Sequence, residues 1–161
     1  MKPNITPPSV WTNPLHFVAF GFGSGALPFA PGTWGTVVAI PLYLAIRDLS
    51  LAYYLTILFV AIIAGIWLCD KVAKEVGVHD HSGIVWDEIV GYGVTMIAAP
   101  HEWQWIIIGF LLFRLFDIWK PWPIGWIDKH APGGFGSVID DIVAAIYAWL
   151  VLQGLAYLIQ A

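Results

Sequence analysis

Long uninterrupted runs of apolar residues dominate this chain. The clearest run covers residues 49–69 and contains no charged residue. At about 1.5 Å per helical residue it is long enough to cross a bilayer core of about 30 Å. Residues 142–161 form a second uncharged run of similar length. Both runs predict membrane-spanning helices.

Three other apolar segments are shorter. Residues 34–46 are interrupted by Pro41, residues 84–99 begin with charges, and residues 102–119 carry charges near their end. A Pro-His-Glu sequence at 100–102 predicts a tight turn between the last two segments. The pattern therefore predicts an all-α integral membrane bundle of about five helices, some of them short or re-entrant. The glycine- and proline-rich residues 21–35 predict a loop or a re-entrant segment.

The length of 161 residues suits one domain. We interpret residues 1–14, which contain four prolines, as an N-terminal cytoplasmic tail. They contain no uninterrupted apolar core of the kind that a cleavable signal peptide needs. Residues 15–161 are predicted to form a single membrane domain.

Composition supports a membrane location. The chain is 59% hydrophobic and 11% charged, whereas globular chains carry about 25% charge. Its ten tryptophans and six tyrosines fit side chains that concentrate at membrane interfaces. A net charge of −4 argues against nucleic-acid binding, which needs a basic face. Cys69 is the only cysteine, so an internal disulfide is excluded.

The distribution of charge predicts an orientation. Five crossings would place the N-terminal tail and the loops at 70–87 and 120–141 on one face. That face holds five lysines, with Arg114 nearby, whereas the opposite face holds only Arg47. Because basic residues favour the cytoplasmic side, we expect this face to be cytoplasmic. It also collects nine of the eleven acids, of which Asp70, Glu75 and Asp128 are interpreted as ordinary boundary charges.

Three polar groups on that face are candidates for chemistry. They are His79-Asp80-His81 with Asp87 and Glu88 at the start of the third helix, Arg114-Asp117-Lys120, and a glycine run followed by Asp140 and Asp141 at the start of the last helix. Each group also has a structural interpretation. Acids in a first helical turn stabilise the helix dipole, an arginine and an aspartate can form a simple ion pair, and loop histidines can be merely solvated.

The combination favours function, because charges at a membrane boundary are costly unless paired or used. Several carboxylates that converge would repel one another unless a cation lay between them, and hard cations such as Mg²⁺ prefer carboxylate oxygens. Cationic side chains beside such an ion are typical of sites that bind and transfer phosphoryl groups.

The ordered motifs resemble those of the phosphatidylglycerophosphatase A family. The resemblance runs from about Gly21 to Tyr147 and rests on these segments: GFGSG (21–25), PGTWG (31–35), HDH (79–81), IVWDE (84–88), FRLFD (113–117), KPWPI (120–124), GGFG (133–136) and the pair Asp140-Asp141. It implies a magnesium-dependent lipid phosphatase of the bacterial inner membrane. The implied substrate is phosphatidylglycerophosphate, and no protein partner is expected.

We assign hypothetical roles to the residues of these motifs. The metal ligands are predicted among Asp80, Asp87, Glu88, Asp117, Asp140 and Asp141, with one member of each adjacent pair pointing inward. Arg114 and Lys120, and less directly Lys129, are predicted to hold the phosphate. His79 or His81 is predicted to protonate the leaving alkoxide. The predicted catalytic residues are therefore Asp87, Glu88, Asp117, Asp141, His79 and His81, and a phospho-aspartate route stays open.

Three other functions are alternatives. A transporter or channel would also use intramembrane carboxylates, although we would expect these to be spread across the membrane depth. A lipid phosphotransferase would use carboxylates and Mg²⁺, but its repeated aspartates are not found here. A non-catalytic scaffold would give no reason for clustered carboxylates.

Overall fold

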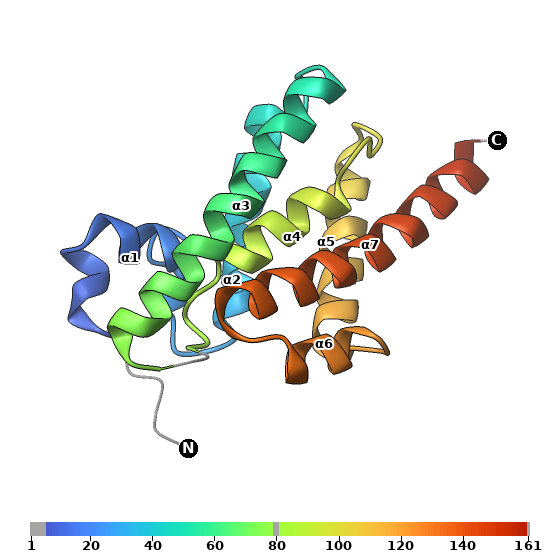
Figure 1. Cartoon of the computed structure of the whole chain (residues 1–161). Helices are drawn as coiled ribbons and strands as arrows, with labels where there is room; N and C mark the ends of the chain where they lie inside the picture. Colours follow the sequence, from blue (N-terminus) through green and yellow to red (C-terminus); the bar gives the residue numbers. More distant parts are fainter. Residues whose placement is uncertain (1–5, 79–80, 161) are drawn as a thin grey trace.

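The structure is a computed structural model, and it describes residues 6–78 and 81–160. In that part of the chain the regular elements are all helical, which confirms the predicted all-α class. The elements, which Figure 1 labels in part, are η1 (Pro8–Trp11), α1 (Pro14–Ala19), η2 (Ser24–Ala26), α2 (Pro31–Ile46), α3 (Leu51–Val76), α4 (Trp86–Thr95), α5 (Trp103–Trp119), α6 (Ile124–His130) and α7 (Gly133–Gln160).

Two of these helices, α3 and α7, are long and apolar enough to cross a membrane. The helices α2 and α5, with 16 and 17 residues, each extend over about 25 Å. By contrast α4 has 10 residues and extends over only about 15 Å, so it cannot cross a bilayer by itself. Pro41 does not interrupt α2, which continues through it to Ile46.

The short helix α4 lies at the centre of the bundle, where it packs against α2, α3, α5 and α7 (Figure 1). Small side chains allow this close packing. Ala144, Ala145 and Ala148 of α7 are fully buried. Gly91 of α4 faces the ring of Phe113, which lies where a Cβ atom would project. The fold therefore holds the N-terminal turn of α4 firmly against its neighbours.

The prediction of about five helices omitted two short ones, α1 and α6, which have six and seven residues. Such helices are too short to show an apolar period. A second difference concerns α7, which begins at Gly133 rather than at residue 142. The prediction that Asp140 and Asp141 lie at the start of the last helix was therefore wrong. They lie about two turns inside α7, beyond the reach of a first-turn dipole effect.

The N-terminal segment packs onto the C-terminal half of α3. Val10 is fully buried in a cluster that includes Leu68 and Val72. His16 links the segment to α3, because its Nδ1 lies 3.0 Å from Ser9 Oγ and its Nε2 lies 2.8 Å from Glu75 Oε2. Residues from Pro8 onward are thus part of the folded structure, and the cytoplasmic location of the segment stays a prediction.

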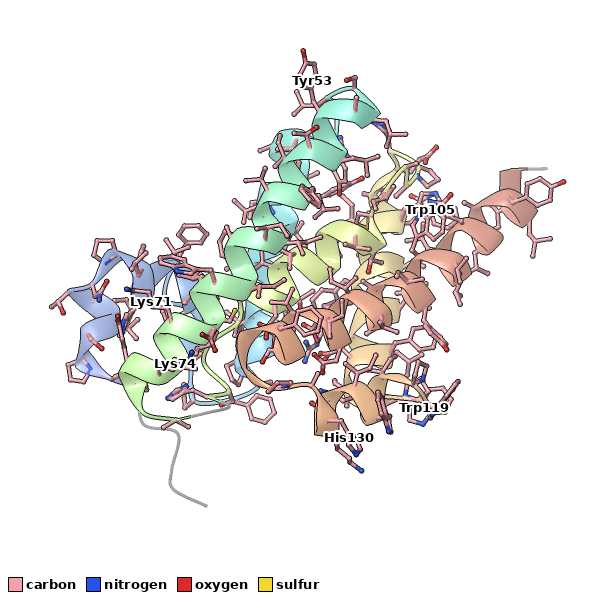
Figure 2. The ribbon with its side chains drawn as sticks, in the orientation of Figure 1. Tyr53, Lys71, Lys74, Trp105, Trp119 and His130 are labelled. Carbon is pink, nitrogen blue, oxygen red and sulfur yellow. The ribbon has the colours of Figure 1, made fainter. Side chains whose placement is uncertain are left out.

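Exposed aromatic side chains mark both ends of the bundle. Tyr53 and Trp103 are exposed at one end, and Trp119, Trp122 and Trp126 are exposed at the other. Figure 2 shows Tyr53 at the top of the view and Trp119 and His130 near the bottom. Trp103 and Trp119 are the two terminal residues of α5. The two aromatic layers are separated along α5 by about 25 Å, somewhat less than a bilayer core of about 30 Å. Trp and Tyr side chains favour the two interfaces of a bilayer.

Candidate active site

Three carboxylates converge where the first turn of α4 meets α7. Asp87 and Glu88 come from α4, and Asp141 comes from α7. One oxygen from each lies within 4.8 Å of the other two, and this is the metal-compatible group of acids and histidines found in the described residues. Two tightly packed helices carry all three, so helical backbone rather than a loop sets their positions.

The carboxylate cluster lacks sufficient partners within the protein. Glu88 Oε2 and Asp141 Oδ2 are buried and have no hydrogen-bond partner. Burial removes solvation from the charged forms and raises the pKa of Asp87 to about 6. Burial and the nearby Asp87 charge also raise the pKa of Glu88. A bound cation would favour the charged forms and occupy the unpartnered oxygens, so the three acids fit a divalent metal ion.

The two basic side chains of the site are already paired with other acids. Arg114 Nη1 lies 2.5 Å from Asp117 Oδ2 and 4.0 Å from Glu88 Oε1. Lys120 Nζ lies 2.6 Å from both Asp128 Oδ1 and Asp140 Oδ2. Burial alone would lower the pKa of Lys120, but its two carboxylate partners outweigh that effect and raise it. Among the three clustered acids only Glu88 has a basic neighbour, the distant and shared Arg114, so the cluster keeps an excess of negative charge.

The clustered acids and the two basic side chains line a cavity of about 260 Å³. Six acids and two bases contribute to its wall, together with His81, three residues at the start of α2 and two serines. The lining residues are Ala30, Pro31, Gly32, His81, Ser82, Ile84, Asp87, Glu88, Arg114, Asp117, Lys120, Asp128, Ser137, Asp140 and Asp141. The cavity is therefore strongly polar and holds more negative than positive charge.

His81 occupies the loop that precedes α4. Its side chain is buried, and its ring packs against Phe20 with a centroid distance of 5.2 Å. The backbone N–H of Gly83 donates a hydrogen bond of 3.0 Å to His81 Nδ1. The other nitrogen, Nε2, is buried without a partner. This loop is close to residues 21–25, since a Cβ at Gly83 would lie 2.7 Å from the carbonyl oxygen of Gly25.

The start of α2 forms another part of the cavity wall. Ala30 has a left-handed backbone conformation, and no side chain caps the helix. Gly32 lies so close to the acidic cluster that a Cβ atom would collide with Glu88 Oε1 and lie 3.2 Å from Arg114 Nη1. Glycine at this position therefore permits the helix N-terminus to contact the cluster directly.

Most of the predicted site residues meet in this cavity. Those that line it are His81, Asp87, Glu88, Arg114, Asp117, Lys120, Asp140 and Asp141. Lys129 is exposed on α6 and is not among the lining residues. His79 and Asp80 lie outside the described residues. Of the converging acids, both members of the Asp87-Glu88 pair contribute to the cluster, although one was expected to point away.

Three residues of the cavity wall were not predicted as site residues. Asp128 was interpreted as a boundary charge, but it pairs with Lys120 because the turn after α5 brings α6 back toward the cavity. Ser137 lines the wall because α7 begins before it rather than after it. Ser82 lies between the motifs at 79–81 and 84–88, and its position between them could have indicated that it lines the site.

The family model for phosphatidylglycerophosphatase A matches residues 17–156. This match includes every residue that lines the cavity. The chain belongs to the phosphatidylglycerophosphatase A family. The resemblance carried by the sequence motifs is thereby confirmed, and the chain is an enzyme of this phosphatase family.

Individual relatives agree with the family match. Phosphatidylglycerophosphatase A of Escherichia coli K12 is 45% identical over 149 residues, which cover 92% of this chain and 84% of the relative. Its Haemophilus influenzae counterpart is 45% identical and covers 90% of both chains. A putative phosphatidylinositol-3-phosphatase of Bacteroides thetaiotaomicron is 37% identical, covering 84% of this chain and 89% of the relative. No solved structure matches the chain.

Proposed function

We propose that this enzyme hydrolyses the terminal phosphate of phosphatidylglycerophosphate with the help of Mg²⁺. The products are phosphatidylglycerol and inorganic phosphate, so a P–O bond forms to water and the ester P–O bond breaks. The observation that carries the proposal is the cluster of Asp87, Glu88 and Asp141. It combines two unpartnered buried oxygens with a surplus of negative charge in a polar cavity. Such a cluster is suited to a hard divalent cation.

The residues of the chain divide into two roles. Asp87, Glu88 and Asp141 would hold the metal ion, which when bound would polarise the phosphoryl oxygens and activate water for attack. Arg114 orients Asp117 and retains one unpartnered N–H, at Nε, that is available to a phosphate. Lys120 ties Asp140 to Asp128 and so fixes the part of α7 that carries Asp141.

The location of the cavity suits a phospholipid substrate. It lies near the end of the bundle that carries Trp119, Trp122 and Trp126, whose rings favour the headgroup layer. We propose that α3 and α7 and their neighbours are embedded in a bacterial inner membrane and that this end faces the cytoplasm. A phosphate at the headgroup level would then reach the cavity while the acyl chains stay in the lipid.

The test is release of inorganic phosphate by the purified protein in lipid. Phosphatidylglycerophosphate is compared with phosphatidic acid and phosphatidylinositol 3-phosphate, each in Mg²⁺ and in EDTA. We expect fast release from phosphatidylglycerophosphate in Mg²⁺ and none in EDTA. Equal activity in EDTA would contradict the metal site, and preference for the phosphoinositide would replace the proposed substrate by the one named for the Bacteroides relative.

A further inference from the structure

One ring nitrogen of His81 takes part in a hydrogen bond, and the other has no hydrogen-bond partner. Because Gly83 N–H donates to Nδ1, that nitrogen presents its lone pair, and in the neutral ring the proton is on Nε2. This N–H group is buried without an acceptor in the protein. A buried donor without a partner destabilises the protein, because it has lost its hydrogen bonds to water. A ligand with an acceptor oxygen would remove that cost.

The loop geometry keeps His81 in this form. Gly83 lies two residues after His81, so the bond to Nδ1 resembles the turn that an asparagine side chain makes with its own backbone. Two backbone hydrogen bonds hold the loop after His81, since Val85 N–H donates to the carbonyl oxygen of Ala19 and Ile84 N–H donates to that of His81. Adding a proton to Nδ1 would place two donors against each other. His81 is therefore suited to donate a hydrogen bond, and poorly suited to the role of general acid expected from the sequence.

The first turn of α2 lies on the wall of the same cavity as His81. The helix has 16 residues and no side-chain cap at Ala30. The N-terminus of a helix carries a partial positive charge and favours anions. Gly32 brings this turn close to Arg114, whose Nε is also buried without a partner. Unpartnered donors and a positive helix end thus line the same cavity as the clustered carboxylates, and Gly32 places the helix end directly beside Glu88.

We propose that His81 is a phosphate-binding residue that donates Nε2–H to a phosphoryl oxygen held at the N-terminus of α2. This inference rests on the proposed phosphatase function and specifies how its site recognises the phosphate. The phosphate is then bound largely by neutral donors, since the positive charges of Arg114 and Lys120 are matched by Asp117, Asp128 and Asp140.

The test uses a pair of substitutions that separate the two ring nitrogens. His81→Asn keeps an acceptor for Gly83 N–H and removes the distal donor, whereas His81→Gln can place an amide N–H near the position of Nε2. The probe is inorganic phosphate, titrated calorimetrically into the purified protein with saturating Mg²⁺. We expect His81→Asn to weaken phosphate binding roughly 10- to 100-fold, the range for a hydrogen bond to a charged group. His81→Gln should recover a large part of this loss.

Two controls complete the experiment. Both variants should show the wild-type affinity for Mg²⁺ and the wild-type melting temperature in lipid, because neither substitution touches the carboxylate cluster. Wild-type phosphate affinity in His81→Asn, or equal weakening in both variants, would overturn the inference. Turnover of phosphatidylglycerophosphate is measured on the wild type in parallel. Its absence would refute the proposed function alone, whereas turnover with a phosphate affinity that His81→Asn does not change would refute this inference alone.

Discussion

The charges of single residues in the cavity do not balance, and this is the basis of the proposed metal site. Six carboxylates and two basic side chains line it. Arg114 and Lys120 are each shared with carboxylates outside the Asp87-Glu88-Asp141 cluster. Removing one basic partner from a buried pair is strongly destabilising, because it leaves an uncompensated buried charge. The three clustered acids share only the distant Arg114, so their excess of negative charge is the feature that the proposed metal ion would offset.

Asp141→Asn should separate metal binding from folding. The substitution removes a buried carboxylate but keeps the side-chain shape, so we expect the variant to fold and to be at least as stable as the wild type in EDTA. Turnover should fall by more than about 100-fold, because a metal ligand is lost. Mg²⁺ should raise the melting temperature of the wild type by mass action and leave that of the variant unchanged.

Asp48→Asn provides the matched control for this prediction. Asp48 lies in the loop between α2 and α3, and its side chain is 72% exposed. The variant should keep wild-type turnover and the wild-type response to Mg²⁺. A normal response to Mg²⁺ in Asp141→Asn would show that the metal binds elsewhere.

At the level of elements, local pattern predicted some helix boundaries and not others. The predicted start at residue 84 lies close to the actual start of α4 at Trp86, because charged residues open an apolar run there. The start of α7 was not predicted, since the glycine run at 133–136 is typical of a loop. The glycines serve a different purpose, because a Cβ at Gly134 would collide with the backbone of Asp70 and Ile66 in α3. Close approach of two helices is a tertiary contact, which the local sequence does not encode.

Two glycines of α7 offer a test of this explanation. Gly134→Ala should force α7 away from α3 and destabilise the protein by roughly 1–3 kcal/mol, as overpacking usually does. Gly154→Ala lies in the same helix, with no atom within 4 Å of the added Cβ. It should leave stability unchanged or increase it by up to about 1 kcal/mol. Thermal unfolding in the same lipid or detergent measures both changes, and equal effects would show that the α3–α7 contact tolerates a side chain.

At the level of the whole molecule, the two aromatic layers lie at opposite ends of the bundle, and the polar cavity lies near one of these ends. The composition predicted the membrane setting, and the fold adds two helices of spanning length with exposed aromatic residues at both ends. The positions of the acids along the sequence predicted that they would gather at one end. Their actual pairing could not be predicted, because Lys120 meets Asp128 and Asp140 only after α6 and α7 fold back beside α5.

The difference between the two ends of the bundle leads to a prediction about its orientation in the membrane. Lys129 on α6 and Asp48 between α2 and α3 are both exposed and lie near opposite ends of the bundle. If the cavity faces the cytoplasm, as the excess of lysines at that end indicates, a membrane-impermeant maleimide should label Asp48→Cys in intact cells. It should label Lys129→Cys only after the membrane is opened. The native Cys69 is 2% exposed, so it should add little background, and a Cys69→Ala version of each variant checks this. Labelling of Lys129→Cys in intact cells would place the cavity on the outer side, where a substrate made in the cytoplasm would first have to cross the membrane.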